Sequence, residues 1–271
     1  MNDNRPGTAL ITGASAGIGA TYADRLARRG HDLILVARDR ARMEQQAARL
    51  HRETGRDVAV HPADLTDPAA LAELGRLIEG TADLRMVVNN AGLALPANFV
   101  DVEAHQLLEL LSVNVVAAAV VARAAARAFR QRGTGAIINL SSVVALNPED
   151  FDPAYSATKA FVLNLTQGLA AQLEPKGVRV HAVLPGATRT EIWGRSGKDA
   201  DAFPAEIMMS VDDLVDAALV GFDRGETVTI PPMPDESQFD AMQAARRALA
   251  NLSRREVAPR YRVAAHAGDT L

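Results

Sequence analysis

Short runs rich in β-forming residues, most of them continuously apolar, alternate with longer helical patterns along most of the chain. Seven runs are predicted strands: Thr8–Thr12, Asp32–Ala37, Asp57–His61, Met86–Asn89, Ala136–Leu140, Val178–Leu184 and Thr227–Ile230. Continuous apolar runs are typical of strands that are buried on both faces of a parallel sheet. Their alternation with helices predicts a three-layer αβα doubly wound Rossmann fold with a seven-stranded parallel sheet and right-handed crossovers.

The helical stretches have their own start and stop signals. Asp67 followed by Pro68 predicts an N-cap with proline in the first helical turn. Because neither a linker nor a repeat divides the sequence, residues 1–271 are predicted to form one domain. Within it we expect a core at about 7–230, a lid at about 191–209 and a helical extension at about 235–271.

The composition argues against several classes of function. The net charge of −4 gives no reason to propose nucleic acid or an anionic membrane as a partner. With no cysteine there is no thiolate nucleophile, and the six histidines never stand four residues apart, which argues against a metal site. The N-terminus is polar and the apolar stretches look too short or too charged to span a membrane. We therefore expect a cytoplasmic location.

A glycine-rich segment follows the first predicted strand. It reads Thr12-Gly13-Ala14-Ser15-Ala16-Gly17-Ile18-Gly19 and leads into a helical pattern. Glycines let the backbone turn tightly and let a phosphate approach the first helical turn, where unpaired amides favour negative charge. This strand–loop–helix context predicts a dinucleotide site, and a tight turn without a ligand is the alternative.

The end of the second predicted strand bears on which dinucleotide binds. An acidic residue there accepts hydrogen bonds from the ribose hydroxyls of NAD, whereas an arginine pairs with the 2′-phosphate of NADP. Ala37 provides no carboxylate and Arg38 follows it. The sequence therefore favours NADP(H), with NAD(H) possible. Asp39 is a competing ribose ligand or the N-cap of a helix that begins at Arg40, and Arg38 is alternatively only a surface charge.

Tyr155 and Lys159 have the spacing with the most specific chemistry. Residues four apart on a helix project from the same face. A neighbouring cation favours the phenolate and lowers the tyrosine pKa from its usual value of about 10. Such a phenol can donate or accept the proton of reversible carbonyl chemistry. Because chance pairs of this spacing occur on solvent-facing helices, the interpretation depends on the other motifs.

Taken together, these motifs resemble the classical short-chain dehydrogenase/reductase family from about Thr8 to Ile230. The resemblance rests on the order Thr12-Gly13-x-x-x-Gly17-Ile18-Gly19, Asn89-Asn90-Ala91-Gly92, Asn114, Ser142, Tyr155-x-x-x-Lys159 and Pro185-Gly186-x-x-x-Thr190. It implies that Tyr155 is the general acid or base and that Lys159 lowers its pKa and binds the nicotinamide ribose. It also implies that Ser142 orients the carbonyl and that Asn114 holds a water chain to the lysine.

Two of these assignments have competitors in the sequence. Ser141 is an alternative to Ser142, and only one of them should enter the site because neighbouring strand residues point to opposite faces. Asn114 is alternatively a polar residue at a cap or kink of a buried helix.

The resemblance also implies a set of cofactor-binding residues. Asp64 would contact the adenine amino group, unless it only forms a turn, and Thr190 would hold the nicotinamide carboxamide. The full predicted set is Gly13, Ser15, Gly17, Ile18, Gly19, Arg38, Asp64, Leu65, Asn90, Ala91, Gly92, Tyr155, Lys159, Pro185, Gly186, Thr188 and Thr190.

Substrate identity should depend on the lid, defined as residues 191–209. Val144, Phe151 and Trp193 are the candidate substrate contacts, and their apolar character suggests a substrate with a hydrophobic portion. A helix that packs on the core explains the apolar residues of the lid nearly as well. Steroids, sugars, acyl thioesters and small ketones all remain open.

The predicted function is hydride transfer between NADP(H) and a carbonyl or secondary alcohol. The alternative is a catalytically silent dinucleotide-binding scaffold, which would be under no pressure to keep all four catalytic residues. The family resemblance implies a homodimer or homotetramer through the helices at Glu103–Gln131 and Pro153–Glu174. Six arginines in the segment Arg246–Arg262 indicate a solvated tail or a subunit contact rather than a ligand site.

Overall fold

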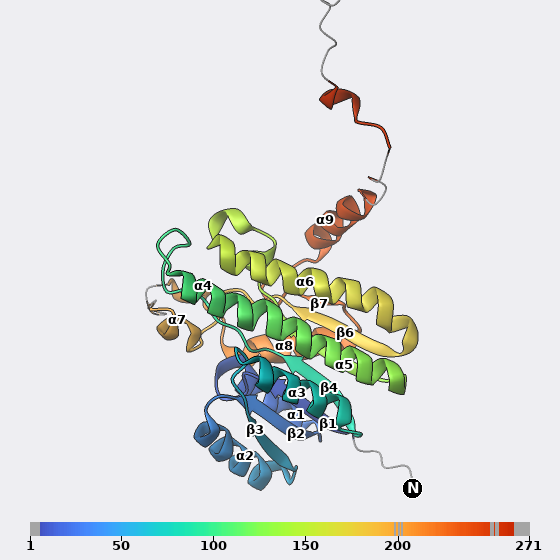
Figure 1. Ribbon diagram of the computed structural model, residues 1–271. Coiled ribbons are helices and arrows are strands. Elements are labelled where there is room, and N and C mark those ends of the chain that lie inside the picture. Colours follow the sequence, from blue (N-terminus) through green and yellow to red (C-terminus); the bar gives the residue numbers. More distant parts are fainter. Residues whose placement is uncertain are drawn as a thin grey trace, which may run out of the picture. The chain divides into compact units, whose positions relative to one another are not determined.

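The computed structural model has seven parallel strands in one sheet, in the order β3-β2-β1-β4-β5-β6-β7 (Figure 1). It describes residues 6–197, 199, 201, 203–249, 252 and 255–262. The strands are β1 (Thr8–Thr12), β2 (Asp32–Ala37), β3 (Val58–Pro62), β4 (Leu84–Asn89), β5 (Gly135–Leu140), β6 (Val178–Val183) and β7 (Val228–Thr229). The predicted doubly wound fold is confirmed.

The predicted strand positions hold, but several ends differ. β4 begins at Leu84, two residues before the predicted Met86, and β7 is only Val228–Thr229. β7 pairs with β6 alone, through two residues, and lies at the edge of the sheet. The flanking Thr227 still bonds to β6, since its carbonyl accepts a hydrogen bond of 2.8 Å from Ala182 N.

Helices cover both faces of the sheet (Figure 1). One face carries α1 (Gly17–Arg28), α2 (Arg40–Thr54) and α8 (Val211–Arg224), and the other carries α3 (Pro68–Gly80), α5 (Ala118–Arg132) and α6 (Pro153–Leu173). The strands supply both cores because their side chains alternate: Ile11 belongs to the first cluster and Leu10 to the second. Each fully buried side chain of this size contributes about 1.5–3 kcal/mol.

Aspartate caps set where two of these helices begin. Asp67 Oδ1 accepts a hydrogen bond of 2.9 Å from Ala69 N, with Pro68 in the first turn of α3, as predicted. Asp39 Oδ1 accepts one of 3.0 Å from Arg42 N, so Asp39 is the N-cap of α2. The cap interpretation of Asp39 is therefore correct, because the carboxylate is turned into its own helix.

The predicted long helix over Glu103–Gln131 is interrupted. α4 (Ala104–Leu111) leads into a π-helical turn, η1 (Ser112–Ala117), and then into α5. The run Ala104–Arg132 has a mean hydropathy of 1.8 in its most apolar window, 44% of which is buried. By length and composition it could cross a membrane, contrary to our expectation, although a core helix of a soluble protein passes the same test.

The described chain divides after Pro232 into two compact units. The second contains α9 (Ser237–Ala248) and the short turn η7 (Pro259–Tyr261). α9 accounts for the first part of the helical extension expected at about 235–271. Of the arginines between Arg246 and Arg262, Arg254 lies outside the described residues. That the whole chain acts as one domain stays a prediction.

Candidate active site

The glycine-rich loop joins the carboxyl end of β1 to the first turn of α1. Gly13 and Gly17 have φ values of +66° and +52°, which favour glycine. A Cβ on Gly19 would lie 2.3 Å from Gly13 O, so only glycine fits there. The N-cap Ala16 offers no side chain to the first amides of α1. These unpaired amides fit the pyrophosphate of a dinucleotide.

The residues at the end of β4 hold the start of the glycine loop by hydrogen bonds to Thr12. Asn90 Nδ2 donates to Thr12 O at 2.9 Å, and the amides of Asn90 and Ala91 each donate to Thr12 Oγ1 at 3.0 Å. A Cβ on Gly92 would lie 3.4 Å from Lys159 Nζ. The predicted motif at 89–92 therefore lies between the glycine loop and Lys159.

The ends of β2 and β3 form the predicted adenosine side. Arg38 is exposed, with Nη1 at 3.9 Å from Glu109 Oε1 of α4. Asp64 Oδ1 accepts hydrogen bonds from Thr66 N at 2.9 Å and Thr66 Oγ1 at 2.8 Å. These bonds, with the Arg38 charge, lower the pKa of Asp64. Asp64 thus forms the turn, and Leu65 is buried beside it. The adenine contact of Asp64 and the cofactor contact of Leu65 stay predictions.

Asn114 lies in the π-helical turn η1 and is buried. Its Nδ2 donates to Leu93 O at 2.9 Å and to Thr158 Oγ1 at 3.1 Å, and its Oδ1 accepts from Leu93 N at 2.8 Å. π-turns are rare and occur frequently at functional sites. The side chain therefore ties the loop after β4 to α6, which carries Thr158 and Lys159.

Tyr155 and Lys159 lie on the first two turns of α6, as their spacing predicts. Asp152 caps this helix, and its Oδ1 accepts a hydrogen bond of 2.8 Å from Tyr155 N. Lys159 is buried, its Nζ donates to Leu140 O at 3.1 Å, and the same atom lies 5.6 Å from the centroid of the Tyr155 ring. The phenol and the amine therefore share one site at the carboxyl end of β5.

The pKa of the tyrosine shifts in the direction opposite to our expectation. Burial raises the pKa of Tyr155 to about 12 and lowers the pKa of Lys159 to about 8. Burial is the cause of both shifts, because a low-dielectric surrounding disfavours the charged form of either group. Tyr155 therefore keeps its proton at neutral pH, which is the state that an acid catalyst of carbonyl reduction needs.

The two candidate serines have different partners. Ser141 Oγ donates to Lys159 O at 2.7 Å, so this hydroxyl holds the backbone of α6. Ser142 Oγ donates to Pro185 O at 3.3 Å and accepts from Val144 N at 3.4 Å, both long bonds. Because weak bonds are easily exchanged, Ser142 is the hydroxyl that can turn to a substrate oxygen. Its catalytic role stays a prediction.

The segment after β6 approaches the glycine loop. Thr190 Cγ2 would lie 3.4 Å from a Cβ on Gly17, which places Thr190 beside the first turn of α1. Arg189 N donates to Met209 O at 3.0 Å and Met209 N donates to Ala187 O at 2.9 Å. These bonds join the two ends of the lid. Pro185, Gly186 and Thr188 precede it, and their cofactor contacts stay predictions.

The three candidate substrate residues come from separate segments. Val144 is buried in the turn η2 (Val143–Ala145), and Phe151 is exposed just before α6. Trp193 lies in α7 (Ile192–Arg195) of the lid and donates from Nε1 to Thr188 O at 2.8 Å. Its ring lies 4.7 Å from that of Phe203 between centroids, with the two planes tilted by 47°. An aromatic pair thus stands in the lid, and its contact with substrate stays a prediction.

Sequence reasoning missed three residues that position the site. They are Asp152, which caps the catalytic helix, Thr158, which binds Asn114, and Thr12, whose hydroxyl holds the loop after β4. Asp152-Pro153 repeats the Asp67-Pro68 signal, so the cap was detectable. The hydroxyl contacts of Thr12 and Thr158 depend on tertiary neighbours and have no local signal.

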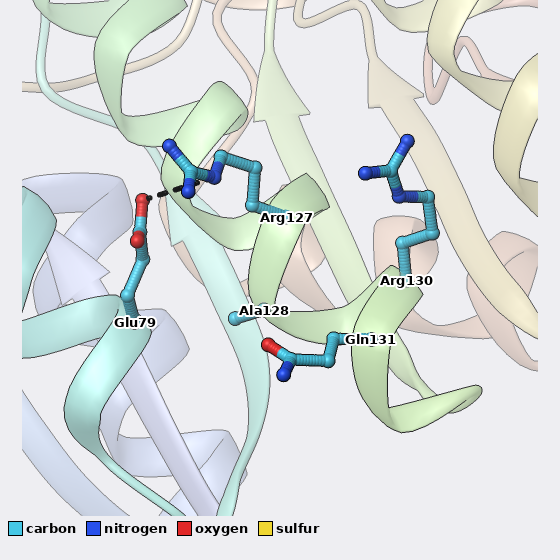
Figure 2. A pocket seen from close by; sticks show the side chains of 5 residues that line it. All are labelled: Glu79, Arg127, Ala128, Arg130 and Gln131. Atoms are coloured by element: carbon cyan, nitrogen blue, oxygen red, sulfur yellow. Dashed lines mark ion pairs between the residues drawn. The ribbon is translucent and has the colours of Figure 1, made fainter.

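A surface hollow of about 270 Å³ lies away from these residues. It is lined by Glu79, Arg127, Ala128, Arg130 and Gln131, and Arg127 Nε lies 3.7 Å from Glu79 Oε1 (Figure 2). Its α5 residues lie in the last turns of that helix, which lead to the beginning of β5. The catalytic groups lie at the opposite, carboxyl end of the strands, so this hollow is not the active site. Among the described residues, no acidic or histidine cluster could hold a metal ion.

Comparison with known proteins decides the family. The sequence model described as "short chain dehydrogenase" matches residues 7–201. The chain belongs to this family. A short-chain dehydrogenase from Sphingobium yanoikuyae in complex with NADPH is 51% identical, with a TM-score of 0.92, covering 94% of this chain and 100% of that chain.

Two further relatives are named for their substrates. The bulky-bulky ketone specific alcohol dehydrogenase from Comamonas testosteroni is 45% identical, with a TM-score of 0.87, covering 94% of this chain and 98% of its own. Galactitol 2-dehydrogenase (L-tagatose-forming) from Cereibacter sphaeroides is 32% identical over 244 residues, covering 81% of this chain and 94% of its own. The present short-chain dehydrogenase is accordingly an oxidoreductase that acts on a carbonyl or alcohol group with a nicotinamide cofactor.

Proposed function

We propose that this enzyme reduces ketones with two bulky apolar substituents, using NADPH. Tyr155, whose ring centroid lies 5.6 Å from Lys159 Nζ, is the group that would donate the proton to the ketone oxygen. The substrate class rests on the similarity to the Comamonas testosteroni enzyme and on the aromatic pair Trp193–Phe203 in the lid. A cytoplasmic location stays part of the proposal.

The chain's own residues suit an acid-catalysed reduction. Bound NADPH supplies the hydride to the carbonyl carbon. Tyr155 donates its phenolic proton to the carbonyl oxygen, which Ser142 orients by a hydrogen bond. Lys159, a buried cation with a pKa of about 8, stabilises the phenolate that remains when Tyr155 has given up its proton. Asp152 and Asn114 hold the backbone and neighbours of these groups in place.

The proposed substrate class predicts an order of reactivity. We expect the kcat/KM of valerophenone to exceed that of acetone by about tenfold or more, because additional buried methylenes stabilise the bound state. NADPH consumption at 340 nm, with L-tagatose as the polar comparison, measures this order. If L-tagatose were the best of the three substrates, the bulky-ketone proposal would be wrong while the family assignment would stand.

The preference for NADP(H) rests on Arg38. This exposed guanidinium lies at the end of β2, where no carboxylate is available, since Asp39 caps α2. We expect Arg38→Asp to raise the Kd of NADPH by about tenfold or more and to leave that of NADH nearly unchanged, because the 2′-phosphate loses its partner and meets a like charge. Nucleotide titrations of both proteins measure it, and an unchanged ratio of the two constants would count against the NADP(H) preference.

We further propose that the enzyme is a homo-oligomer that pairs through α4, η1 and α5. Leu108 and Val116 on this segment are 63% and 52% exposed, an apolar face that a second copy would cover. Light scattering should give a multiple of the 28.8 kDa chain mass. Leu108→Glu should shift the mass towards that of one chain, because a charge would be buried at the contact. A wild-type monomer at micromolar concentration would refute the proposal.

A further inference from the structure

An ion pair joins the second helix to the lid. Arg42 Nη1 lies 2.9 Å from Glu191 Oε2, and Arg42 Nη2 lies 2.5 Å from Glu191 Oε1. Two parallel bonds between a guanidinium and a carboxylate form the strongest common geometry for such a pair. The partners are 149 residues apart in the sequence, so local helix formation does not explain their contact.

The arginine is on the side of α2 that faces the glycine loop. Arg42 lies in the first turn of α2, where its amide is bound by the cap Asp39. Gln46, one turn further along the same face, donates from Nε2 to Ala20 O of α1 at 3.1 Å. Residues four apart share a helix face, so Arg42 projects towards the beginning of α1. That end of α1 is the expected position of the cofactor phosphates.

The glutamate approaches the same place from the other side. Glu191 directly follows Thr190, which lies beside Gly17 in the glycine loop, and it directly precedes α7 of the lid. The ion pair therefore spans from α2 to the first residue of the lid, near the N-terminus of α1. This position is close to the adenosine side of the cofactor site, which Arg38 marks.

The distribution of positive charge makes this arginine informative. The glycine loop from Thr12 to Gly19 contains no basic side chain. In the same first turn of α2, Arg40 lies 3.4 Å from Glu44 along its own helix. Arg38 has a long contact of 3.9 Å with Glu109 and acts through its charge on Asp64. Arg42 is therefore the guanidinium that α2 directs towards the loop, and a carboxylate holds it there.

We propose that Arg42 is a second ligand for the 2′-phosphate of NADP(H), beside Arg38, and that Glu191 competes with the phosphate for it. This inference rests on the NADP(H) preference proposed above. Glu191 keeps the guanidinium extended towards the glycine loop, and the phosphate then replaces the carboxylate. Because Glu191 begins the lid, the replacement releases one of the contacts that fix the lid to α2.

The energetics favour such an exchange. Both side chains of the pair are 45% exposed, so water screens their attraction and little is lost when they separate. A 2′-phosphate carries more negative charge than a carboxylate and offers three acceptor oxygens to two guanidinium groups. The 2′-phosphate therefore wins the competition, whereas NAD(H), which lacks that phosphate, leaves the Arg42–Glu191 pair intact.

Fragments of the cofactor isolate this effect from catalysis. Calorimetric titrations with 2′,5′-ADP and with AMP compare ligands that differ by the 2′-phosphate alone. We expect Arg42→Gln to raise the Kd of 2′,5′-ADP by about tenfold, because a charge-assisted contact is lost. The Kd of AMP should stay unchanged. Glu191→Gln should lower the Kd of 2′,5′-ADP by a factor about two to five times larger than any decrease in the Kd of AMP, because an exposed competitor is removed. Arg40→Gln is the matched control and should change neither ligand.

The double variant tests the competition itself. In a protein that already carries Arg42→Gln, Glu191→Gln should no longer improve the binding of 2′,5′-ADP more than that of AMP. The guanidinium for which the carboxylate competes is then absent. Trp193, the one tryptophan of the chain, stands two residues after Glu191 and reports on the lid. Its fluorescence should change with NADP⁺ more than with NAD⁺ in the wild type, and equally with both in Arg42→Gln.

Two results would overturn this inference and leave the proposed function intact. One is an equal loss of 2′,5′-ADP and AMP affinity in Arg42→Gln, or no loss of either. The other is a lower affinity for 2′,5′-ADP in Glu191→Gln, which would mean that Glu191 positions Arg42 for the phosphate and does not compete with it. Failure of the wild type to prefer 2′,5′-ADP over AMP would instead refute the NADP(H) preference on which the inference rests.

Discussion

Tyr155→Phe should lower kcat for ketone reduction by about 10²–10⁴-fold while NADPH binds as in the wild type. The substitution removes one hydroxyl and keeps the ring that packs over Lys159. Without the phenolic proton, the alkoxide that develops during hydride transfer has no acid to neutralise it. Single-turnover NADPH oxidation measures the chemical step, and a nucleotide titration measures binding. Equal single-turnover rates in the two proteins would remove the proton-donor role from Tyr155.

Tyr22→Phe provides the matched control for this experiment. Tyr22 is fully buried in α1, and among the described residues its hydroxyl has no hydrogen-bond partner. Deletion of an unpaired buried hydroxyl is neutral or stabilising, since a desolvated polar group is removed. We therefore expect unchanged kcat and an equal or higher melting temperature. If Tyr22→Phe lost as much activity as Tyr155→Phe, the removal of a buried tyrosine hydroxyl would lower activity by disturbing the structure and not by removing the proton donor.

The sequence predicts the parts of the site that have local or ordered signals. Gly13, Gly17 and Gly19 have the conformations and close contacts that their spacing indicates. Tyr155 and Lys159 share one helix face, as a spacing of four residues requires. Such features follow from backbone geometry over a few residues, so they can be found before the tertiary structure is known.

Other properties of the site depend on tertiary surroundings. The pKa of Tyr155 rises because of burial, and the degree of burial is not encoded in the spacing of the pair. The π-helical turn at Asn114 forms where this side chain binds Leu93 and Thr158, from two other segments. The Arg42–Glu191 pair likewise joins two surfaces that only the fold brings together.

Gly19→Ala should both destabilise the enzyme and abolish tight nucleotide binding. The added Cβ would lie 2.3 Å from Gly13 O and 2.5 Å from Asn90 Nδ2. The first of these atoms is backbone and cannot rotate away, so the loop and the first turn of α1 must separate. Overpacking of this kind costs about 1–3 kcal/mol, and displaced amides no longer converge on a phosphate. We expect a melting temperature lower by several degrees and a Kd for NADPH raised by about tenfold or more.

Gly75→Ala distinguishes this steric cause from a general effect of replacing a helical glycine. Gly75 lies inside α3, and a Cβ there would meet nothing within 4 Å. Alanine loses less conformational freedom than glycine when a helix forms, so this change should stabilise the fold by about 0.5–1 kcal/mol and leave NADPH affinity unaltered. Opposite signs for the two substitutions would locate the effect of Gly19 in its contact with the glycine loop. If Gly19→Ala instead bound NADPH as tightly as the wild type, the first turn of α1 would not be the phosphate site, and the pyrophosphate would have to bind elsewhere on the enzyme.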